Sequence, residues 1–121
     1  MYELRVESGF AAAHSLRGYQ GNCEQLHGHN WKVEVRLAVE GLDELGLAMD
    51  FREVKKLLKE VLEGLDHTHL NELQPFRSEN PSTERLASYI FQELAARLPA
   101  EVTLTEVTAW ESPGSAATYR P

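Results

Sequence analysis

Three of the five histidines and the only cysteine of the chain lie in one short stretch, residues 14–29. They are His14, Cys23, His27 and His29. Residues i and i+2 of a strand point to the same face of a sheet, so His27 and His29 can aim at one point. Three neutral imidazoles suit zinc and leave a fourth position open for water or substrate, as in catalytic zinc sites. The pattern therefore predicts a zinc site on His27, His29 and, from a neighbouring strand, His14.

Cys23 can be interpreted in two ways. A thiol beside a metal ion and imidazole groups ionises readily, and the thiolate could then act as a base. As a fourth ligand, the same sulfur would close a structural zinc site instead. The polar residues around it, 21–25, argue against a small buried apolar side chain. We favour the base and keep the closed site as the alternative.

A second group of chemically active side chains follows in Leu65-Asp66-His67. An aspartate can orient a neighbouring imidazole, which then shuttles a proton. The alternative for Asp66 is a solvated residue at the end of a helix. His69, two residues further on, could take the place of His67 or add a fourth zinc ligand.

Near the end of the chain, Glu111 follows Trp110 and precedes a turn. A carboxylate in this position could accept two parallel N–H bonds from the edge of an amino-pyrimidinone ring. Otherwise it is a solvent-facing residue at a strand end. Thr83 and Glu84 stand at a predicted helix start, where an acidic residue also simply complements the helix dipole.

Alternation of apolar and polar residues predicts four strands. His14 falls on the apolar side of the first strand. His27 and His29 have the parity of the apolar residues Trp31 and Val33 in the second. All three imidazoles should therefore point to an interior face of the sheet. The predicted strands are residues 2–14, 29–40, 101–111 and 116–120.

Two amphipathic helices should separate the strand pairs. Asp50 is a good N-cap for the first, with Glu53 three residues on, and Gly64 marks its end. The second should start at Asn80-Pro81, a cap followed by proline, and stop before Pro99. The order β-β-α-α-β-β predicts an α+β domain with a four-stranded antiparallel sheet and two helices on one face. The exposed edges of such a sheet favour a homo-oligomer.

Length and composition set the class of protein. The 121 residues suit a single domain, 1–121. The formal net charge of −7, without a basic patch, argues against a nucleic-acid partner and mildly against a polyphosphorylated substrate. One cysteine cannot form an intramolecular disulfide, no apolar run could cross a bilayer, and the N-terminus lacks the features of a signal peptide. We therefore expect a cytoplasmic protein with no membrane partner.

The histidines, the cysteine and the acidic residues described above, in their order along the chain, resemble the motifs of the 6-pyruvoyl-tetrahydropterin synthase / 6-carboxy-tetrahydropterin synthase family. The resemblance extends over essentially the whole chain. The combination of Cys23-x-x-x-His27-Gly28-His29 with Leu65-Asp66-His67 carries the resemblance. The compact length is similar to that of the bacterial carboxy-tetrahydropterin synthases of the 7-deazaguanine (queuosine) pathway. Further matching motifs are Phe10-x-Ala12-Ala13-His14, Asp50-Phe51, Asn71, Asn80-Pro81-Ser82-Thr83-Glu84 and Trp110-Glu111.

The resemblance implies a tunnelling fold, in which subunits pair edge to edge into a trimer and two trimers stack as a hexamer. It implies zinc on the three histidines and Cys23 as the proton-abstracting base. Asp66 and His67 would complete a catalytic triad across a subunit boundary, giving composite active sites. Glu111 would anchor the pterin ring, assisted by Thr83 and Glu84. The implied substrate is 7,8-dihydroneopterin triphosphate, and the implied products are 6-carboxy-tetrahydropterin, acetaldehyde and triphosphate, without nicotinamide or flavin.

Glu24 departs from this pattern, because the chain also contains Glu24-x-x-His27-Gly28-His29. Relatives that cleave dihydroneopterin to 6-hydroxymethyl-dihydropterin, a folate-pathway bypass, carry a glutamate in place of the cysteine. Glu24 is thus a candidate modifier of specificity, or else a solvated loop residue. The pyruvoyl and hydroxymethyl products remain alternatives to the carboxy product. A non-catalytic zinc-stabilised binding module, with Cys23 as fourth ligand, is the alternative from another class. Arg17 and Lys32 are nearby positive charges without an assigned role.

Overall fold

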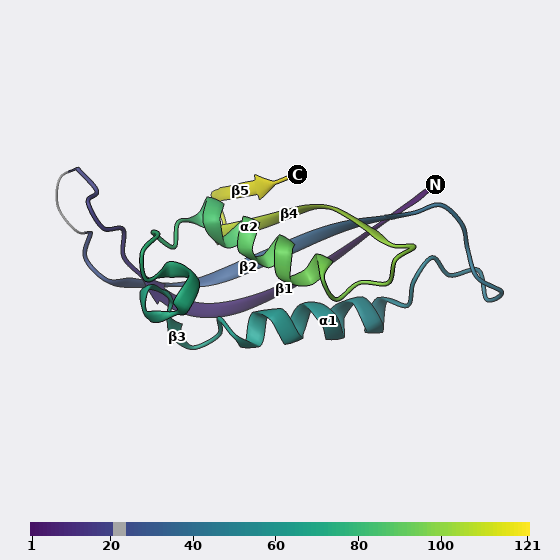
Figure 1. Ribbon diagram of the computed structural model, residues 1–121, viewed down its shortest axis with the longest axis horizontal. Helices are drawn as coiled ribbons and strands as arrows, with labels where there is room; N and C mark the ends of the chain where they lie inside the picture. Colours follow the sequence, from purple (N-terminus) through teal and green to yellow (C-terminus); the bar gives the residue numbers. More distant parts are fainter. Residues whose placement is uncertain (21–23) are drawn as a thin grey trace.

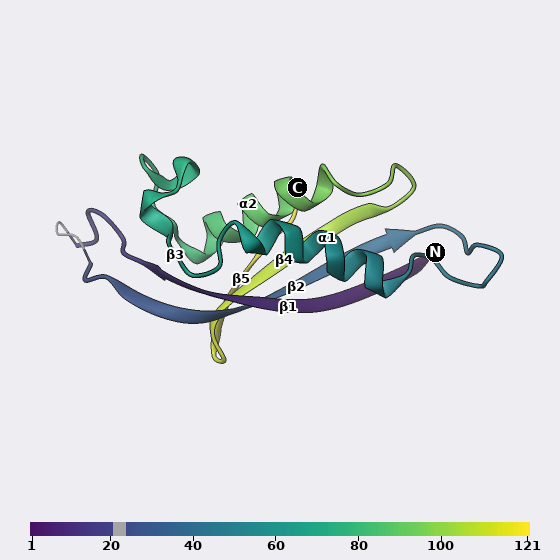
Figure 2. The same ribbon diagram turned by 90° about the horizontal axis from the view of Figure 1, so that it is seen from below.

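The computed structural model describes residues 1–20 and 24–121, so the predictions for Cys23 lie outside the described residues. Within these residues, one sheet is formed by five strands, and two α-helices and two short 3₁₀ helices accompany it. Figure 2 shows both α-helices on the same side of the sheet. The elements in Figure 1 are β1 (Tyr2–His14), β2 (His27–Val39), α1 (Phe51–Glu63), β3 (Thr68–His69), η1 (Leu70–Glu72), η2 (Gln74–Phe76), α2 (Thr83–Ala95), β4 (Thr103–Ser112) and β5 (Ser115–Tyr119).

The strand order is β3-β1-β2-β4-β5. β3 runs parallel to β1, and the other neighbours are antiparallel. The prediction of a four-stranded antiparallel sheet is therefore wrong, since the described residues form a mixed sheet of five strands. The missed strand, β3, has only two residues, which pair with Ala12 and Ala13. Two residues carry no alternation, so this strand is defined only by its main-chain pairing with β1.

The two long strands, β1 and β2, contribute many of the buried side chains of the core. Along β2, alternate side chains from Trp31 to Val39 are buried, and Val33, Val35 and Leu37 have no exposed surface. Leu58 of α1 is equally buried against them. Replacing such a leucine by alanine costs about 2–5 kcal/mol of unfolding free energy. A core of this kind makes the strands a rigid support for side chains at their ends.

The structure confirms the predicted start of α1 but not that of α2. The Asp50 side chain caps α1 by accepting from the Arg52 N–H at 2.8 Å, and Gly64 follows its last residue, as predicted. The predicted start of α2 at Asn80-Pro81 is wrong, because Ser82 is its N-cap and accepts from the Arg85 N–H at 3.2 Å. The Asn80 side chain is bonded to the backbone of Arg17 instead and does not cap the helix.

The face of the sheet without helices carries charged side chains. Arg36 lies 3.3 Å from Glu34, 3.5 Å from Glu106 and 3.7 Å from Glu3. Ion pairs of this kind near the surface contribute about 0–1 kcal/mol each to the free energy of unfolding. They therefore suit a solvated face but add little to the stability of the fold. Along its outer edge, β1 pairs with a described strand only at Ala12 and Ala13. Among the described helices, none combines the length and apolar character needed to cross a membrane.

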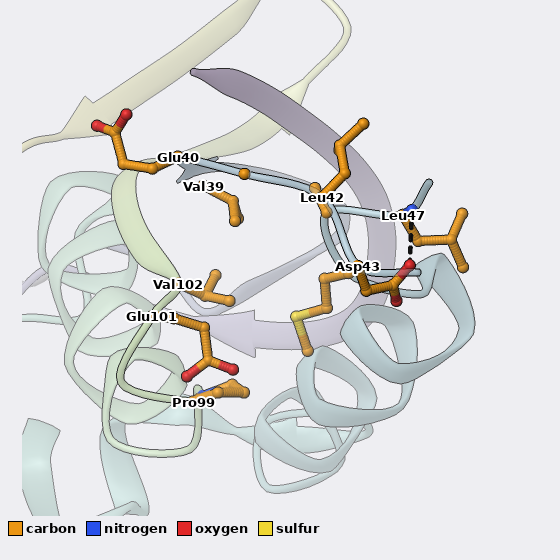
Figure 3. Close-up of a pocket in the computed structure, with 11 residues that line it drawn as sticks. Val39, Glu40, Leu42, Asp43, Leu47, Pro99, Glu101 and Val102 are labelled. Carbon is orange, nitrogen blue, oxygen red and sulfur yellow. Dashed lines mark hydrogen bonds between the residues drawn. The ribbon is translucent and has the colours of Figure 1, made fainter. Parts of the chain in front are cut away.

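A cavity of about 660 Å³ lies at the end of the sheet away from the histidines. Val39 and Val102 line it together with the 41–49 loop, and Glu40 and Glu101 add acidic groups (Figure 3). Asp43 folds this loop by accepting from the Leu47 N–H at 2.9 Å. β2 begins at His27 and ends at Val39, a separation of about 40 Å for an extended strand. The cavity is thus separate from the histidine cluster.

Candidate metal centre and active site

The register of β1 and β2 brings the three imidazoles together. His14 pairs with His27, and Ala12 pairs with His29, so the rings occupy neighbouring positions on one face. Their centroids are 4.7 Å apart for His14 and His27, 5.1 Å for His14 and His29, and 4.7 Å for His27 and His29. His14 is 2% exposed, and the other two are half-buried. The cluster is therefore buried at His14 and partly open to solvent at His27 and His29.

Backbone carbonyls determine which ring nitrogens carry protons. His14 Nδ1 lies 2.8 Å from the Pro81 oxygen, and His27 Nδ1 lies 2.8 Å from the Gln25 oxygen. A carbonyl oxygen can only accept, so in both rings Nδ1 donates and Nε2 presents a lone pair. The two Nε2 atoms face each other at 3.1 Å. Two nitrogens bound tetrahedrally to one zinc ion lie about 3.3 Å apart, so this spacing fits a shared cation.

Glu111 closes the cluster from β4. Its Oε1 lies 3.5 Å from His29 Nε2, and its Oε2 accepts from the Thr83 hydroxyl at 2.9 Å. One ligand atom from each of His14, His27, His29 and Glu111 lies within 4.8 Å of all the others. Thr83 is the first residue of α2, so its hydrogen bond links the helix start to the strand end. The predicted pair Thr83 and Glu111 is thus in direct contact beside the histidines.

The donor set fits a divalent metal ion. His29 Nε2 is buried and has no hydrogen-bond partner in the described part of the chain, which is costly unless a ligand satisfies it. Burial lowers the pKa of the His29 imidazole, and His14 and His27 act in the same direction while Glu111 and Glu24 oppose it. A lowered pKa favours the neutral ring, which is the form that binds metals.

Glu24 reaches the edge of this cluster. Its Oε1 lies 3.8 Å from His27 Nδ1 and is buried without a hydrogen-bond partner among the described residues. The Glu24 side chain as a whole is 32% exposed, so it is partly buried at the edge of the cluster. The structure therefore brings Glu24 toward the histidines, whereas the predicted roles of Cys23 lie in the part it does not describe.

Asp66 and His67 form a close pair. Asp66 Oδ2 lies 3.0 Å from His67 Nδ1, and Asp66 Oδ1 accepts from the Ala11 N–H at 2.9 Å. His67 has a φ of 57°, a left-handed conformation that costs free energy for a residue with a side chain. The imidazole is 81% exposed. Its main chain is held by a hydrogen bond from its N–H to the Ala11 oxygen at 2.6 Å.

Within one chain, this pair does not join the metal cluster. His67 is absent from the group of converging ligand atoms. A shallow groove of about 440 Å³ nevertheless has both His29 and His67 in its lining, together with Ala11, Ala13 and Gly28. Ala11, Ala13 and Gly28 alternate with the histidine positions along β1 and β2, so this groove lies over the face of the sheet opposite to the three histidine rings. It therefore does not join the Asp66–His67 pair to the cluster within one chain.

The other predicted residues lie apart from the cluster. Glu84 is exposed in the first turn of α2 and forms no hydrogen bond or ion pair with the described residues. His69 Nδ1 lies 3.3 Å from Glu72, and His69 is not one of the converging ligands. Sequence reasoning gave no role to the Pro81 carbonyl or to the Asn71 side chain, and it interpreted Asn80 only as a helix cap. Both asparagines belong to the motifs that carry the family resemblance. Their place in these motifs was the signal that could have indicated a role at the site.

Comparison with known proteins agrees with this geometry. The family model described as "6-pyruvoyl tetrahydropterin synthase" matches residues 3–121. The chain belongs to this family. It is 35% identical to the 6-carboxy-5,6,7,8-tetrahydropterin synthase of Synechocystis, over 98% of this chain and 93% of the relative. It is 36% identical to the dihydroneopterin monophosphate aldolase of Pyrococcus furiosus, over 86% of this chain and 84% of the relative.

A solved structure gives the same answer for the fold. The 6-pyruvoyl tetrahydropterin synthase of Caenorhabditis elegans superposes with a TM-score of 0.84 at 26% sequence identity, covering 99% of this chain and 95% of the other. The recognition of the family from sequence motifs is therefore confirmed. The relatives carry different product names, so family membership leaves the reaction of this chain to be argued from its site.

Proposed function

We propose that the protein is a zinc-dependent 6-carboxy-5,6,7,8-tetrahydropterin synthase. It would convert 7,8-dihydroneopterin 3'-triphosphate and one water molecule to 6-carboxy-tetrahydropterin, acetaldehyde and triphosphate in the cytoplasm, as a lyase of the 7-deazaguanine (queuosine) pathway. The observation that carries the proposal is the cluster of His14, His27 and His29 with Glu111, in which imidazole lone pairs face one another beside a carboxylate. The name of the Synechocystis relative supports this choice of product.

The protein's own residues supply binding and proton transfer in this proposal. When bound, zinc supplies Lewis acidity at the vicinal hydroxyls of the substrate. Cys23 removes a proton from a carbon atom that bears one of these hydroxyls, and His67, oriented by Asp66 at 3.0 Å, donates or accepts the matching proton. The exposed imidazole of His67 suits a group that meets its substrate from outside its own subunit.

Glu111 recognises the pterin ring. A carboxylate can accept both N–H bonds of an amino-pyrimidinone edge, and the Thr83 hydroxyl holds one of its oxygens in place at 2.9 Å. The contact of the other oxygen with His29 adds a second candidate role, that of a fourth metal ligand. Glu84 is exposed, so in this proposal it assists only indirectly, by its charge at the start of α2.

An oligomer with composite sites accounts for the separation of His67 from the metal cluster. The outer edge of β1 from Tyr2 to Phe10 pairs with no described strand, so its main-chain groups are available to a strand of another subunit. β5 forms the opposite edge of the sheet. Edge-to-edge pairing would give a trimer, and two stacked trimers a hexamer, each site drawing residues from neighbouring subunits.

A second candidate function has its own support. One oxygen of Glu24 is buried 3.8 Å from His27 Nδ1, without a hydrogen-bond partner among the described residues, and the Pyrococcus furiosus relative is a dihydroneopterin monophosphate aldolase. Glu24 as the base would favour cleavage to 6-hydroxymethyl-dihydropterin. A pyruvoyl-forming synthase is the other candidate among enzymes. A zinc-stabilised binding module without catalysis is the candidate from another class.

Product analysis tests the proposal. Zinc-loaded protein is incubated with 7,8-dihydroneopterin triphosphate, and the products are identified by mass spectrometry. We expect 6-carboxy-tetrahydropterin and acetaldehyde, with the Cys23→Ala variant as the inactive control. A 6-hydroxymethyl product would support the aldolase, and a 6-pyruvoyl product the pyruvoyl synthase. If no pterin is consumed while zinc binds stoichiometrically, the binding module replaces the enzyme.

A further inference from the structure

The segment that leaves β1 after the metal ligand His14 is held by two asparagine side chains. The Asn71 carboxamide accepts from the Ser15 N–H at 2.9 Å and donates to the Ser15 oxygen at 2.8 Å. The Asn80 carboxamide accepts from the Arg17 N–H at 2.8 Å and donates to the Arg17 oxygen at 3.0 Å. Each side chain thus makes the pair of hydrogen bonds that a neighbouring strand would make.

The two asparagines bind alternate residues of this segment, Ser15 and Arg17, each through both its N–H and its C=O group. The intervening Leu16 faces the other way, and its oxygen accepts from the Glu24 N–H at 2.8 Å. Ser15, Leu16 and Arg17 are therefore fixed on both sides, between a metal ligand and the segment that carries Glu24.

Arg17 closes the network with its side chain. The guanidinium donates to the Asn71 oxygen at 3.1 Å, to the Phe76 oxygen at 2.8 Å and to the Glu79 oxygen at 3.4 Å. Its N–H groups therefore bind backbone carbonyls of the protein itself. Arg17, to which the sequence assigned no role, thus acts in the fold.

Both asparagines connect this segment to groups of the candidate site. Asn80 immediately precedes Pro81, whose oxygen binds His14 Nδ1 and so directs Nε2 toward the cluster. Asn71 is four residues beyond His67 and is 8% exposed. A displaced Asn80 would shift the Pro81 oxygen, and a displaced Asn71 would loosen the backbone next to His14.

We propose that Asn71 and Asn80 are positioning residues for the metal centre. Their carboxamides replace a missing strand along Ser15–Arg17 and thereby set both the orientation of His14 and the distance from His14 to Glu24. This inference rests on the metal site of the proposed function but not on its reaction. Partners that orient metal ligands typically contribute 10–100-fold to metal affinity, about the range expected here.

The test uses the variants Asn71→Asp and Asn80→Asp in the full-length protein. Each keeps the size and the acceptor of the side chain, but replaces the NH₂ donor by an oxygen that faces a backbone carbonyl. Gln92→Glu is the matched control, because Gln92 is an exposed carboxamide of α2 whose bond goes to the Tyr119 hydroxyl. The readouts are zinc affinity by competition with a chelator, the visible spectrum of the Co²⁺-substituted protein, and the melting temperature of the apoprotein.

We expect both variants to bind zinc about 10- to 100-fold more weakly, with an altered Co²⁺ spectrum, and the control to match the parent protein. If zinc affinity and the Co²⁺ spectrum are unchanged while only the apoprotein melting temperature falls, the asparagines are merely structural and the proposal is overturned. Absence of metal binding in the parent protein overturns it as well. If the parent protein binds zinc but turns over no pterin, the proposed function is wrong. The zinc affinities of the two variants then still decide whether the asparagines position the metal centre.

Amide hydrogen exchange on the parent protein tests the proposal even if the variants fail to fold. Amide hydrogen exchange should show the Ser15 and Arg17 N–H groups protected to a degree comparable with β1, because side-chain bonds replace the strand pairing. Free exchange at both amides would overturn the proposal without any substitution.

Discussion

His14 and His27 point their Nε2 atoms at each other across 3.1 Å, although both rings donate from Nδ1 to backbone carbonyls. Two facing lone pairs repel unless a proton or a cation lies between them. A cation would also satisfy His29 Nε2, which is buried without a hydrogen-bond partner among the described residues. This relationship makes metal binding the first property to measure.

Removal of one imidazole should abolish tight metal binding. We expect one zinc ion per subunit in the parent protein, and for His27→Ala a loss of affinity beyond the 10–100-fold typical of groups that only orient a ligand. Elemental analysis and chelator competition measure both. His69→Ala is the control, since His69 lies 3.3 Å from Glu72 and outside the cluster, and it should keep its zinc. A metal-free parent protein would contradict the assignment.

Cys23 can be assigned by separating metal content from turnover. We expect Cys23→Ala to retain stoichiometric zinc and to lose turnover, because in the proposed mechanism three histidines hold the ion and the thiolate acts on the substrate. Zinc content and product formation are measured on the same preparation. If the metal is lost together with activity, Cys23 is a ligand, and the closed structural site becomes the better interpretation.

Glu111→Gln should weaken pterin binding and spare the metal. The amide keeps the shape of the carboxylate, but it cannot accept both N–H bonds of the pterin edge. Hydrogen bonds to charged groups contribute about 1.5–3 kcal/mol, so we expect a loss of affinity of about 10- to 100-fold by titration calorimetry. Thr83→Val, which removes the hydroxyl that holds Glu111, should have a smaller effect in the same direction. Loss of zinc from Glu111→Gln would instead identify a fourth metal ligand.

The Asp66 carboxylate should make stability depend on pH. The Ala11 N–H lowers the pKa of Asp66, and the hydrogen bond with His67 adds to this. Because the pKa is lower in the folded state, the stabilisation is present above the unfolded value of about 4 and is lost as pH falls through the folded value.

Denaturant unfolding of the parent protein and of Asp66→Asn measures this effect across pH. The parent protein should be the more stable of the two at pH 7, and the difference should shrink below about pH 4. Glu44→Gln controls for the change in net charge, since Glu44 is an exposed loop residue that forms no ion pair with the described residues. A difference that does not vary with pH would exclude an ionised Asp66 as its source.

Subunit mixing tests the composite site. Cys23→Ala and His67→Ala should each be inactive alone, because each lacks one proton-transfer group. Oligomers reassembled from equal amounts of both variants should regain activity in roughly a quarter of their sites, if each site draws the two residues from different subunits. Native mass spectrometry verifies that mixed oligomers have formed. Mixed oligomers without activity would place both residues of a working site in one subunit.

Much of this site could be inferred from the sequence, because its parts obey local rules. The alternation of apolar residues showed that His14 shares the buried face of its strand, and that His27 and His29 share the face of Trp31. The Asp50 cap follows from the preference of a short acceptor side chain for free helix N–H groups. Properties of this kind repeat along the sequence with the period of a strand or helix, so a sequence displays them.

Other features depend on contacts between distant residues, and only the tertiary structure determined them. β3 exists because two residues meet the edge of β1, and Asn80 binds the backbone of Arg17 although its position before Pro81 suggested a helix cap. Thr83 and Glu111 meet because the start of α2 lies over the end of β4. A single side chain bonded across the fold leaves no periodic trace, so its partner is defined only when the whole polypeptide has packed.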